Sequence, residues 1–261
     1  MTALAPVIVI GCPKGGIGRT TLAVNLAAML ALAGKSTLLV DLDAKGDASA
    51  SFGIERAEEG KSAERFGEPW SMIKDSLGAP SPPGLSVWAG GPALTELSAE
   101  LERLEGGCEG LLHAGLVEAR KNYSAIVIDS PSNLGPLACN ALGAGDVLLI
   151  PISEGPHLES ALRDTIQRAL ECREDYTIFG VRFGAPCTEE PEECPLGLDL
   201  LETALCGEPE VFQEAAKRGL PIFEHDPSSR AARCFVELGR EVLRRVVNPP
   251  PKLTGAGAQS A

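Results

Sequence analysis

The sequence contains no apolar run long enough to span a bilayer, although 44% of its 261 residues are hydrophobic. Its first ten residues also lack the basic start and the cleavage site of a secretory leader, and we interpret them as a strand. We therefore expect a cytoplasmic protein. The length fits one large α/β domain with small additions.

Basic charge is scarce as well, since 36 acidic residues against 23 basic ones give a formal net charge of −13. A surface this acidic repels the phosphate backbone and disfavours sequence-independent DNA binding. Residues 184–220 hold nine acidic residues, with Lys217 and Arg218 as their only basic ones. Five arginines near the end of the chain remain candidates for DNA contact, namely Arg230, Arg233, Arg240, Arg244 and Arg245. Glu237 and Glu241 interrupt them, so we interpret this stretch as a solvated helix face and leave DNA binding, and association with the nucleoid, open.

None of the eight cysteines belongs to a CxxC pair, which argues against a disulfide framework and predicts free thiols. The spacing of Cys187 and Cys194 matches no usual pair of metal ligands. The three histidines have no partners visible in the sequence, and two tyrosines are too few for a tyrosine-rich kinase tail.

Short apolar runs alternate with helical patterns along most of the chain. Runs of Val, Ile and Leu predict strands at 6–10, 38–41, 85–88, 125–129, 147–150 and 177–181. Helical patterns occupy 20–32, 93–104, 110–121, 134–142 and 158–172. This alternation predicts an α/β fold, a doubly wound and mostly parallel sheet flanked by helices, with ligands at the carboxyl ends of the strands.

Three segments interrupt the alternation. Residues 55–83 are polar and predict a loop with a short helix at 70–77, and residues 184–221 predict a proline-rich acidic stretch with one or two short helices. The tail 248–261 predicts disorder, and it lacks the amphipathic face of a membrane-binding helix. We therefore expect a single domain over residues 1–247 and no association with membranes.

A glycine-rich string, Gly11-Cys-Pro-Lys-Gly-Gly-Ile-Gly-Arg-Thr-Thr21, links the first expected strand to the first expected helix. An ordinary turn is the alternative, but the length of the string and its context favour a phosphate loop, whose backbone N–H groups turn inward around phosphates. The residues that would surround the phosphates are Gly15, Gly16, Ile17, Gly18 and Arg19. Thr20 stands where a hydroxyl binds Mg²⁺, and Thr21 can bond the α-phosphate.

The segment from Lys14 to Thr21 resembles the deviant Walker A motif of ParA/MinD-type ATPases, KGGxGK followed by two Ser or Thr residues. The resemblance extends over roughly residues 5–57 and 85–246. It implies ATP and Mg²⁺ as cofactors and a homodimer with ATP sandwiched between the subunits. Lys14 would then reach the phosphates of the partner's ATP.

Arg19 departs from this family pattern, which has lysine at that position. The planar fork of arginine is larger than an ammonium group. We expect ATP binding to survive and hydrolysis to be slowed or altered. The alternative is that Arg19 does the work of the lysine unchanged.

Two aspartates, Asp41 and Asp43, follow the second expected strand in a string that resembles the switch I segment of the family, DxDxQGN. By that resemblance Asp43 positions or polarises the attacking water, in a reaction driven by positioning and charge. Asp41 supports the Mg²⁺ site or Lys14 indirectly. Without a phosphate loop, two such aspartates would be ordinary loop carboxylates.

Asp129 ends the fourth expected strand, which is the Walker B arrangement that holds Mg²⁺ through water. The six residues after it, Ser130 to Gly135, resemble switch II of the family. The string around Asp226 and Pro227 resembles the family segment that opens the last long helix, and by that resemblance their backbone borders the adenine. The same Asp-Pro-Ser-Ser is also an ordinary helix cap, and both roles are compatible.

These observations predict an ATPase, a slow and partner-stimulated switch that partitions or positions DNA or protein cargo. An acidic surface would attract an activating partner through a basic segment. One alternative is a nucleotide-binding regulator with little or no hydrolysis, motivated by Arg19. Another is a metal-centre or iron–sulfur maturation ATPase of the same fold, which would need cysteines paired across a dimer axis.

Overall fold

The computed structural model describes residues 4–54, 63–65, 68, 74, 77–104, 110–153, 157–184, 195–206 and 209–249. Six parallel strands form one sheet in the order β3-β2-β4-β1-β5-β6. They are β1 (Val7–Ile10), β2 (Thr37–Asp41), β3 (Leu85–Trp88), β4 (Ala125–Asp129), β5 (Val147–Ile152) and β6 (Thr177–Arg182). All six expected strands are confirmed, and so is the fold class.

The strands are mostly apolar because both faces of the sheet are covered. Successive residues of a strand point to opposite faces, so Ile8 and Ile10 enter one core layer while Val7 and Val9 enter the other. The same alternation divides the residues of β2, β4 and β5. An uninterrupted apolar run therefore serves two cores at once.

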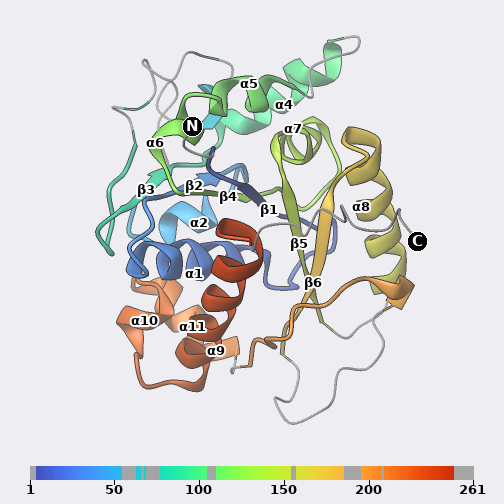
Figure 1. Ribbon diagram of the computed structural model, residues 1–261. Coiled ribbons are helices and arrows are strands. Elements are labelled where there is room, and N and C mark those ends of the chain that lie inside the picture. The colour runs from blue at the N-terminus through green and yellow to red at the C-terminus, as the bar shows by residue number, and fades with distance from the viewer. Residues whose placement is uncertain are drawn as a thin grey trace, which may run out of the picture.

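The helices form two layers, one on each face (Figure 1). The first layer contains α1 (Arg19–Leu32), α2 (Asp47–Ala50), α9 (Pro209–Lys217), α10 (Ile222–His225) and α11 (Arg230–Val242), which continues as a π-helical turn (Leu243–Val247). The second contains α4 (Ala93–Arg103), α5 (Leu111–Leu116), α6 (Ala119–Asn122), α7 (Pro136–Ala144) and α8 (Leu158–Cys172). Ala63–Arg65 and Pro195–Gly197 are short 3-10 helices.

Two expectations need correction. The helix expected at 110–121 is divided into α5 and α6, and Gly115, a weak helix former, lies next to the division. Cys12 and Cys234 are free thiols as expected, but Cys206 is disulfide-bonded, so the expectation is wrong at that residue.

Several expectations fall outside the described residues. They concern most of the segment 55–83 with its helix at 70–77, the tail beyond residue 249, and the cysteines Cys108, Cys187 and Cys194. No helix in the described part of the chain has the length and hydrophobicity needed to cross a bilayer.

Helix α1 lies at the centre of the first layer, between the sheet and α11. The two helices approach closely at Gly239, where a Cβ would come within 2.4 Å of Met29 Cγ. Asn25 of α1 also anchors α10, because its Oδ1 accepts a hydrogen bond from the backbone N–H of Ile222 at 2.8 Å. The phosphate-loop helix is thus packed on three sides.

Residues 200–205 extend the sheet beyond β6 through isolated parallel bridges, Gly180 with Leu200 and Phe183 with Leu205. Glu241 of α11 anchors this segment. Its carboxylate, only 5% exposed, accepts hydrogen bonds from the backbone N–H groups of Glu202 and Thr203 at 2.9 and 3.0 Å. These bonds help to hold the pKa of Glu241 below its usual value despite burial.

Candidate nucleotide-binding site

The three motifs singled out in the sequence meet at the carboxyl edge of the sheet. β1, β4 and β2 are neighbours, and their register places Ile10 opposite Asp129 and Asp129 opposite Asp41. The glycine-rich loop leaves β1 directly after Ile10. Parallel strands bring their ends to one edge, so Asp41 and Asp129, which lie 31 and 119 positions after Ile10 in the chain, converge there by topology.

The loop is open to solvent at Gly15 and Gly16 and packed against the protein at Gly18. Gly16 and Gly18 adopt φ values of 75° and 91°, which favour glycine. A Cβ on Gly15 or Gly16 would meet no atom within 4 Å, whereas one on Gly18 would lie 2.9 Å from the ring of Phe183. Backbone N–H groups at Gly15 and Gly16 are therefore accessible to a ligand, and Ile17 is buried beneath them.

Arg19 is buried at the first position of α1, and its side chain turns back into the loop. Nη1 donates hydrogen bonds to the backbone carbonyls of Cys12 and Lys14, the latter at 3.4 Å. Nε is buried and has no hydrogen-bond partner among the described residues. The guanidinium thus lies within the turn that the glycines form, next to where phosphates would bind.

Thr20 and Asp129 form the second part of the site. The Thr20 hydroxyl donates to Asp129 Oδ2 at 2.8 Å, while Oδ1 of the same carboxylate is buried without a hydrogen-bond partner in the described structure. Burial raises the pKa of Asp129 well above its usual value, and the negative charge of Asp41 adds to the rise. A divalent cation would satisfy the free oxygen and offset the buried charge.

Asp41 lies behind this pair, fully buried. Its carboxylate accepts hydrogen bonds from the Ser49 hydroxyl at 2.7 Å, the Ser49 N–H at 2.9 Å and the Asp43 N–H at 3.1 Å. Burial nevertheless raises the pKa of Asp41 to about 6. These bonds leave Asp41 the role of a support for the loop after β2.

Sequence reasoning missed two residues that build this support. The Ser49 hydroxyl accepts a hydrogen bond from the N–H of Gly90 at 3.0 Å, which ties the loop after β3 to the loop after β2. A Cβ on Gly90 would lie 2.6 Å from the Asp43 carbonyl oxygen and 2.7 Å from Asp41 Cγ. Gly90 lies two residues after the end of β3, and this position at a strand end could have marked it as a candidate site residue.

Asp43 and Lys14 lie at the rim of the site. Asp43 is half-buried, and its Oδ1 accepts a hydrogen bond from the backbone N–H of Lys45 at 3.0 Å, which closes a turn. Lys14 is half-buried, and within the described structure its ammonium makes no hydrogen bond or ion pair. Its side chain is therefore available to a ligand or to a second subunit.

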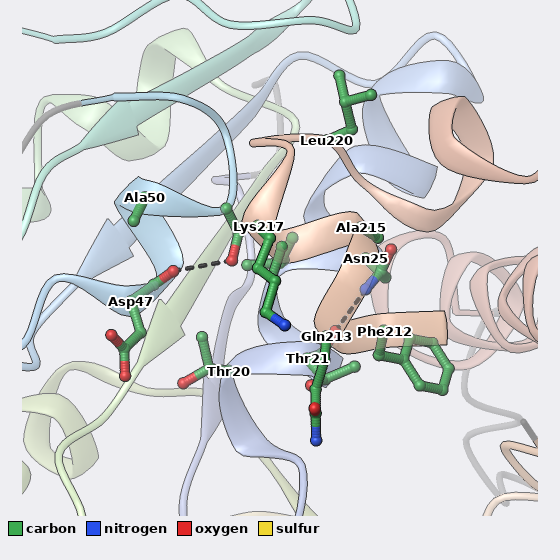
Figure 2. A pocket seen from close by; sticks show the side chains of 13 residues that line it. Thr20, Thr21, Asn25, Asp47, Ala50, Phe212, Gln213, Ala215, Lys217 and Leu220 are labelled. Atoms are coloured by element: carbon green, nitrogen blue, oxygen red, sulfur yellow. Dashed lines mark hydrogen bonds between the residues drawn. The ribbon is translucent and has the colours of Figure 1, made fainter. Parts of the chain in front are cut away.

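A cavity of about 410 Å³ opens beside Thr20 and Thr21. It lies between α1, α2 and α9, and Figure 2 shows Phe212, Gln213 and Lys217 of α9 along one side of it. Its lining combines apolar side chains with polar groups from α1, α2 and α9, which is usual for a ligand site. This cavity could not be anticipated, because α9 is separated from the loop by about 190 residues of sequence.

Asp226 and Pro227 are found at the start of α11. Asp226 Oδ1 accepts hydrogen bonds from the N–H and hydroxyl of Ser228 at 3.2 and 2.9 Å, and the Ser229 hydroxyl accepts one from the Ala232 N–H at 3.0 Å. The capping role is confirmed. Contact of Asp226 and Pro227 with the base stays a prediction.

Comparison of the chain with known proteins identifies its family. A family model described as "AAA domain" matches residues 5–172. The sporulation initiation inhibitor protein Soj of Bacillus subtilis is 32% identical over 256 residues, covering 92% of this chain and 98% of the relative. The chain belongs to the ParA/Soj family of P-loop ATPases.

One further relative and two solved structures resemble this ParA-family chain over most of its length. The chromosome-partitioning ATPase Soj of Thermus thermophilus is 30% identical, covering 89% of the chain and 93% of the relative. Apo McdA from Cyanothece shares the fold with a TM-score of 0.77 at 19% identity, covering 92% of this chain and all of that one. MinD of Pyrococcus horikoshii, complexed with Mg-ADP, has a TM-score of 0.73 at 21% identity, with 92% and 96% covered.

The arginines of the last helix are partly engaged within this ParA-family chain. Arg245 pairs with Glu241 at 3.0 Å and its guanidinium lies 4.5 Å from the Phe179 ring centroid. Arg244 approaches Glu202 at 3.5 Å, and Arg233 donates to the Ser228 carbonyl. The remaining two are exposed, Arg230 and Arg240. This agrees with a solvated helix face.

Proposed function

We propose that this chain is an ATP-dependent, dimerising molecular switch with weak ATPase activity that partitions or positions DNA or protein cargo. One observation carries the proposal: the phosphate loop lies beside a Thr20–Asp129 pair with an unsatisfied carboxylate oxygen, in a member of the ParA/Soj family. Relatives are named chromosome-partitioning ATPases, and one structural neighbour is named a septum site-determining protein.

The loop and its two threonines would bind the phosphates. Backbone N–H groups of residues 15–21 would surround the β- and γ-phosphates, with the Thr21 hydroxyl near the α-phosphate. Mg²⁺ would be held by Thr20 and Asp129, with Asp41 behind them. This small ligand set suits a metal that keeps several waters and shares phosphate oxygens. When bound, the ion neutralises charge on the phosphate chain.

Two rim residues would govern hydrolysis. Asp43 would orient the attacking water once its carboxylate leaves the Lys45 turn. Lys14, whose ammonium is uncommitted in the described structure, would reach the phosphates of the partner's ATP and so link dimerisation to nucleotide. Arg19 would remain the cation of its own loop.

The charge of the molecule favours a particular kind of activator. A net charge of −13 attracts a basic segment and accelerates its encounter with the ATP-bound dimer. The same negative charge disfavours binding to DNA. Three arginines near the end of the chain are also engaged within the protomer, two in ion pairs and one with a backbone carbonyl, which reduces the positive charge available to DNA phosphates. We therefore propose a cytoplasmic protein without membrane binding and leave binding to the nucleoid to experiment.

Size-exclusion chromatography with light scattering tests this function. The protein is run in ADP, in ATP and in a nonhydrolysable analogue, each with Mg²⁺, and the Lys14→Ala variant is run in parallel. The proposal expects dimers in ATP and in the analogue, monomers in ADP, and loss of the dimer in Lys14→Ala. Elution that is independent of nucleotide would overturn it.

A regulator without hydrolysis is the second candidate, and the geometry of Arg19 favours it. A guanidinium held by two loop carbonyls has less freedom to follow the transferring phosphate than the lysine of the family pattern. Dimers that persist in ATP with no phosphate released, even with a cognate activator, would establish this alternative. Phosphate release stimulated by the activator would exclude it.

A further inference from the structure

Helix α9 faces the first turns of α1 across the cavity that begins beside the phosphate loop. Phe212 packs between Phe183 and Phe235, with ring centroids 5.9 and 6.0 Å apart. At the other end of α9, Gly219 meets Gly53 after α2, where a Cβ on Gly219 would be 2.8 Å from the Gly53 nitrogen. The helix is thus fixed at both ends, and its middle faces the cavity next to Thr20 and Thr21.

Lys217 is the cation that α9 presents to this cavity. Figure 2 shows its side chain between Asp47 and Thr21, with the ammonium end directed toward the first turn of α1. Lys217 makes no hydrogen bond or ion pair with any part of the chain that the structure describes. Its neighbour Arg218 is also exposed but does not line the cavity. Lys217 and Arg218 carry the same charge and differ in that Lys217 alone of the two lines the cavity.

The site lacks cationic charge for a triphosphate. Asp41, Asp43 and Asp129 converge on the strand ends, and Asp47 faces the cavity from α2. The guanidinium of Arg19 is already bonded to loop carbonyls. If Lys14 serves the partner's nucleotide, then Arg19 is the one cation that the described part of a protomer places in its own phosphate loop, and its guanidinium is shared with the loop carbonyls until a second subunit supplies Lys14. A second cation at the loop would lower the free energy of the bound anion.

We propose that Lys217 binds the phosphate chain of the nucleotide in its own protomer, entering from the cavity between α1 and α9. The Thr21 hydroxyl and the Lys217 ammonium line one cavity, and both are donors that suit anionic phosphate oxygens. α9 would then be a nucleotide-binding element beside the loop. This inference rests on the proposed function, since it needs a nucleotide at the loop.

Nucleotide titrations of the full chain test the inference with a matched pair of variants. Lys217→Met and Arg218→Met remove the same charge from adjacent positions of one helix end. The inference expects Lys217→Met to raise the Kd for Mg-ATP about tenfold, as loss of one charge-assisted hydrogen bond does, and Arg218→Met to change it less than about twofold. Equal affinities for Lys217→Met and the wild type would overturn it. Failure of the wild type to bind ATP would instead refute the proposed function.

Amine labelling of the wild type supplies a second measurement that does not depend on a variant. Lysines are modified with a small acylating reagent with and without a nonhydrolysable ATP analogue and Mg²⁺, and the sites are quantified by mass spectrometry. Lys217 should become several-fold less reactive with nucleotide, while Lys121, which pairs with Glu118 far from the loop, should not change. Unchanged labelling of Lys217 would contradict direct contact.

Discussion

At the scale of single residues, the phosphate loop contains its own cation. Arg19 fills the turn that the glycines create and bonds to two of its carbonyls, so a nucleotide must be accommodated around a guanidinium that is already fixed. A lysine at this position would have a compact ammonium on a flexible stem, free to move with the γ-phosphate. We therefore expect Arg19 to affect the hydrolysis of ATP more directly than its binding.

We expect Arg19→Lys to bind Mg-ATP with an affinity near that of the wild type but to hydrolyse it faster in a single turnover. An increase of about tenfold would correspond to a barrier lower by ~1.4 kcal/mol. Quench-flow measurement of phosphate release from preformed complexes gives the rate, and a titration gives the affinity. Identical single-turnover rates would show that arginine does the work of lysine unchanged.

The buried carboxylates make a prediction about pH. The pKa of Asp41 is about 6 in the folded chain against 3.8 ordinarily, so the folded state keeps a proton that the unfolded state has lost between these pH values. The free energy of unfolding of the nucleotide-free protein therefore falls as pH rises from about 4 to 6, by up to about 3 kcal/mol from this group. Asp129 acts in the same direction.

Urea unfolding without Mg²⁺ between pH 4 and 7 measures this slope. Asp41→Asn should flatten it, because the asparagine carries no charge to bury, and the exposed Asp47→Asn should leave it as in the wild type. If Asp41→Asn retained the full slope, the burial of Asp41 would not be its cause.

Most site residues could be predicted from the sequence, because each belongs to a string with a strand before it. Asp41, Asp129 and the loop converge as expected once the sheet is parallel. Ser49 and Gly90 could not, because their importance comes from distances to Asp41 that depend on how two loops pack. Arg19 was recognisable as unusual, but its bonds to Cys12 and Lys14 depend on a side-chain conformation that spacing does not specify.

At the scale of elements, the position of the phosphate loop depends on how α1 is held. The sheet, α11 and α10 contact it, and the closest approach is at Gly239 against Met29. The strands were predictable because their apolar runs are short and uninterrupted. The position of α9 beside the cavity was not predictable, since it follows from contacts such as Gly53 with Gly219 between distant segments.

Gly239→Val tests the α1–α11 contact. Its side chain would collide with Met29 Cγ, so we expect the free energy of unfolding to fall by about 2 kcal/mol, the usual cost of overpacking a core. Gly110→Val is the control, because a Cβ there meets no described atom within 4 Å; since Gly110 caps α5, where valine is a poorer residue, a loss of at most about 1 kcal/mol is expected. Urea denaturation measures the free energy of unfolding of both variants, and equal values for the two would contradict the close contact between α1 and α11.

At the scale of the whole molecule, the protein combines a strongly negative net charge with a candidate nucleotide site at the carboxyl edge of the sheet. Phosphate loop, Thr20–Asp129 pair and Lys14 all lie at that edge, so a second subunit placed there would cover the nucleotide. The fold class was predicted in full from the sequence. The dimer is implied by family resemblance, because nothing in the spacing of a single chain specifies a second one.

Subunit mixing tests the sandwiched dimer most directly. In the proposed mechanism, Lys14→Ala lacks the lysine that would serve the partner's site, and Asp43→Ala lacks the carboxylate that would orient water in its own site, so each variant alone should be nearly inactive. In a mixed dimer, the site on the Lys14→Ala subunit has its own Asp43 and receives Lys14 from the Asp43→Ala subunit. We predict that mixing restores up to half of the wild-type ATPase rate per mixed dimer. No recovery at any ratio, with mixed dimers verified by co-purification of two differently tagged subunits, would contradict a lysine that acts across the interface.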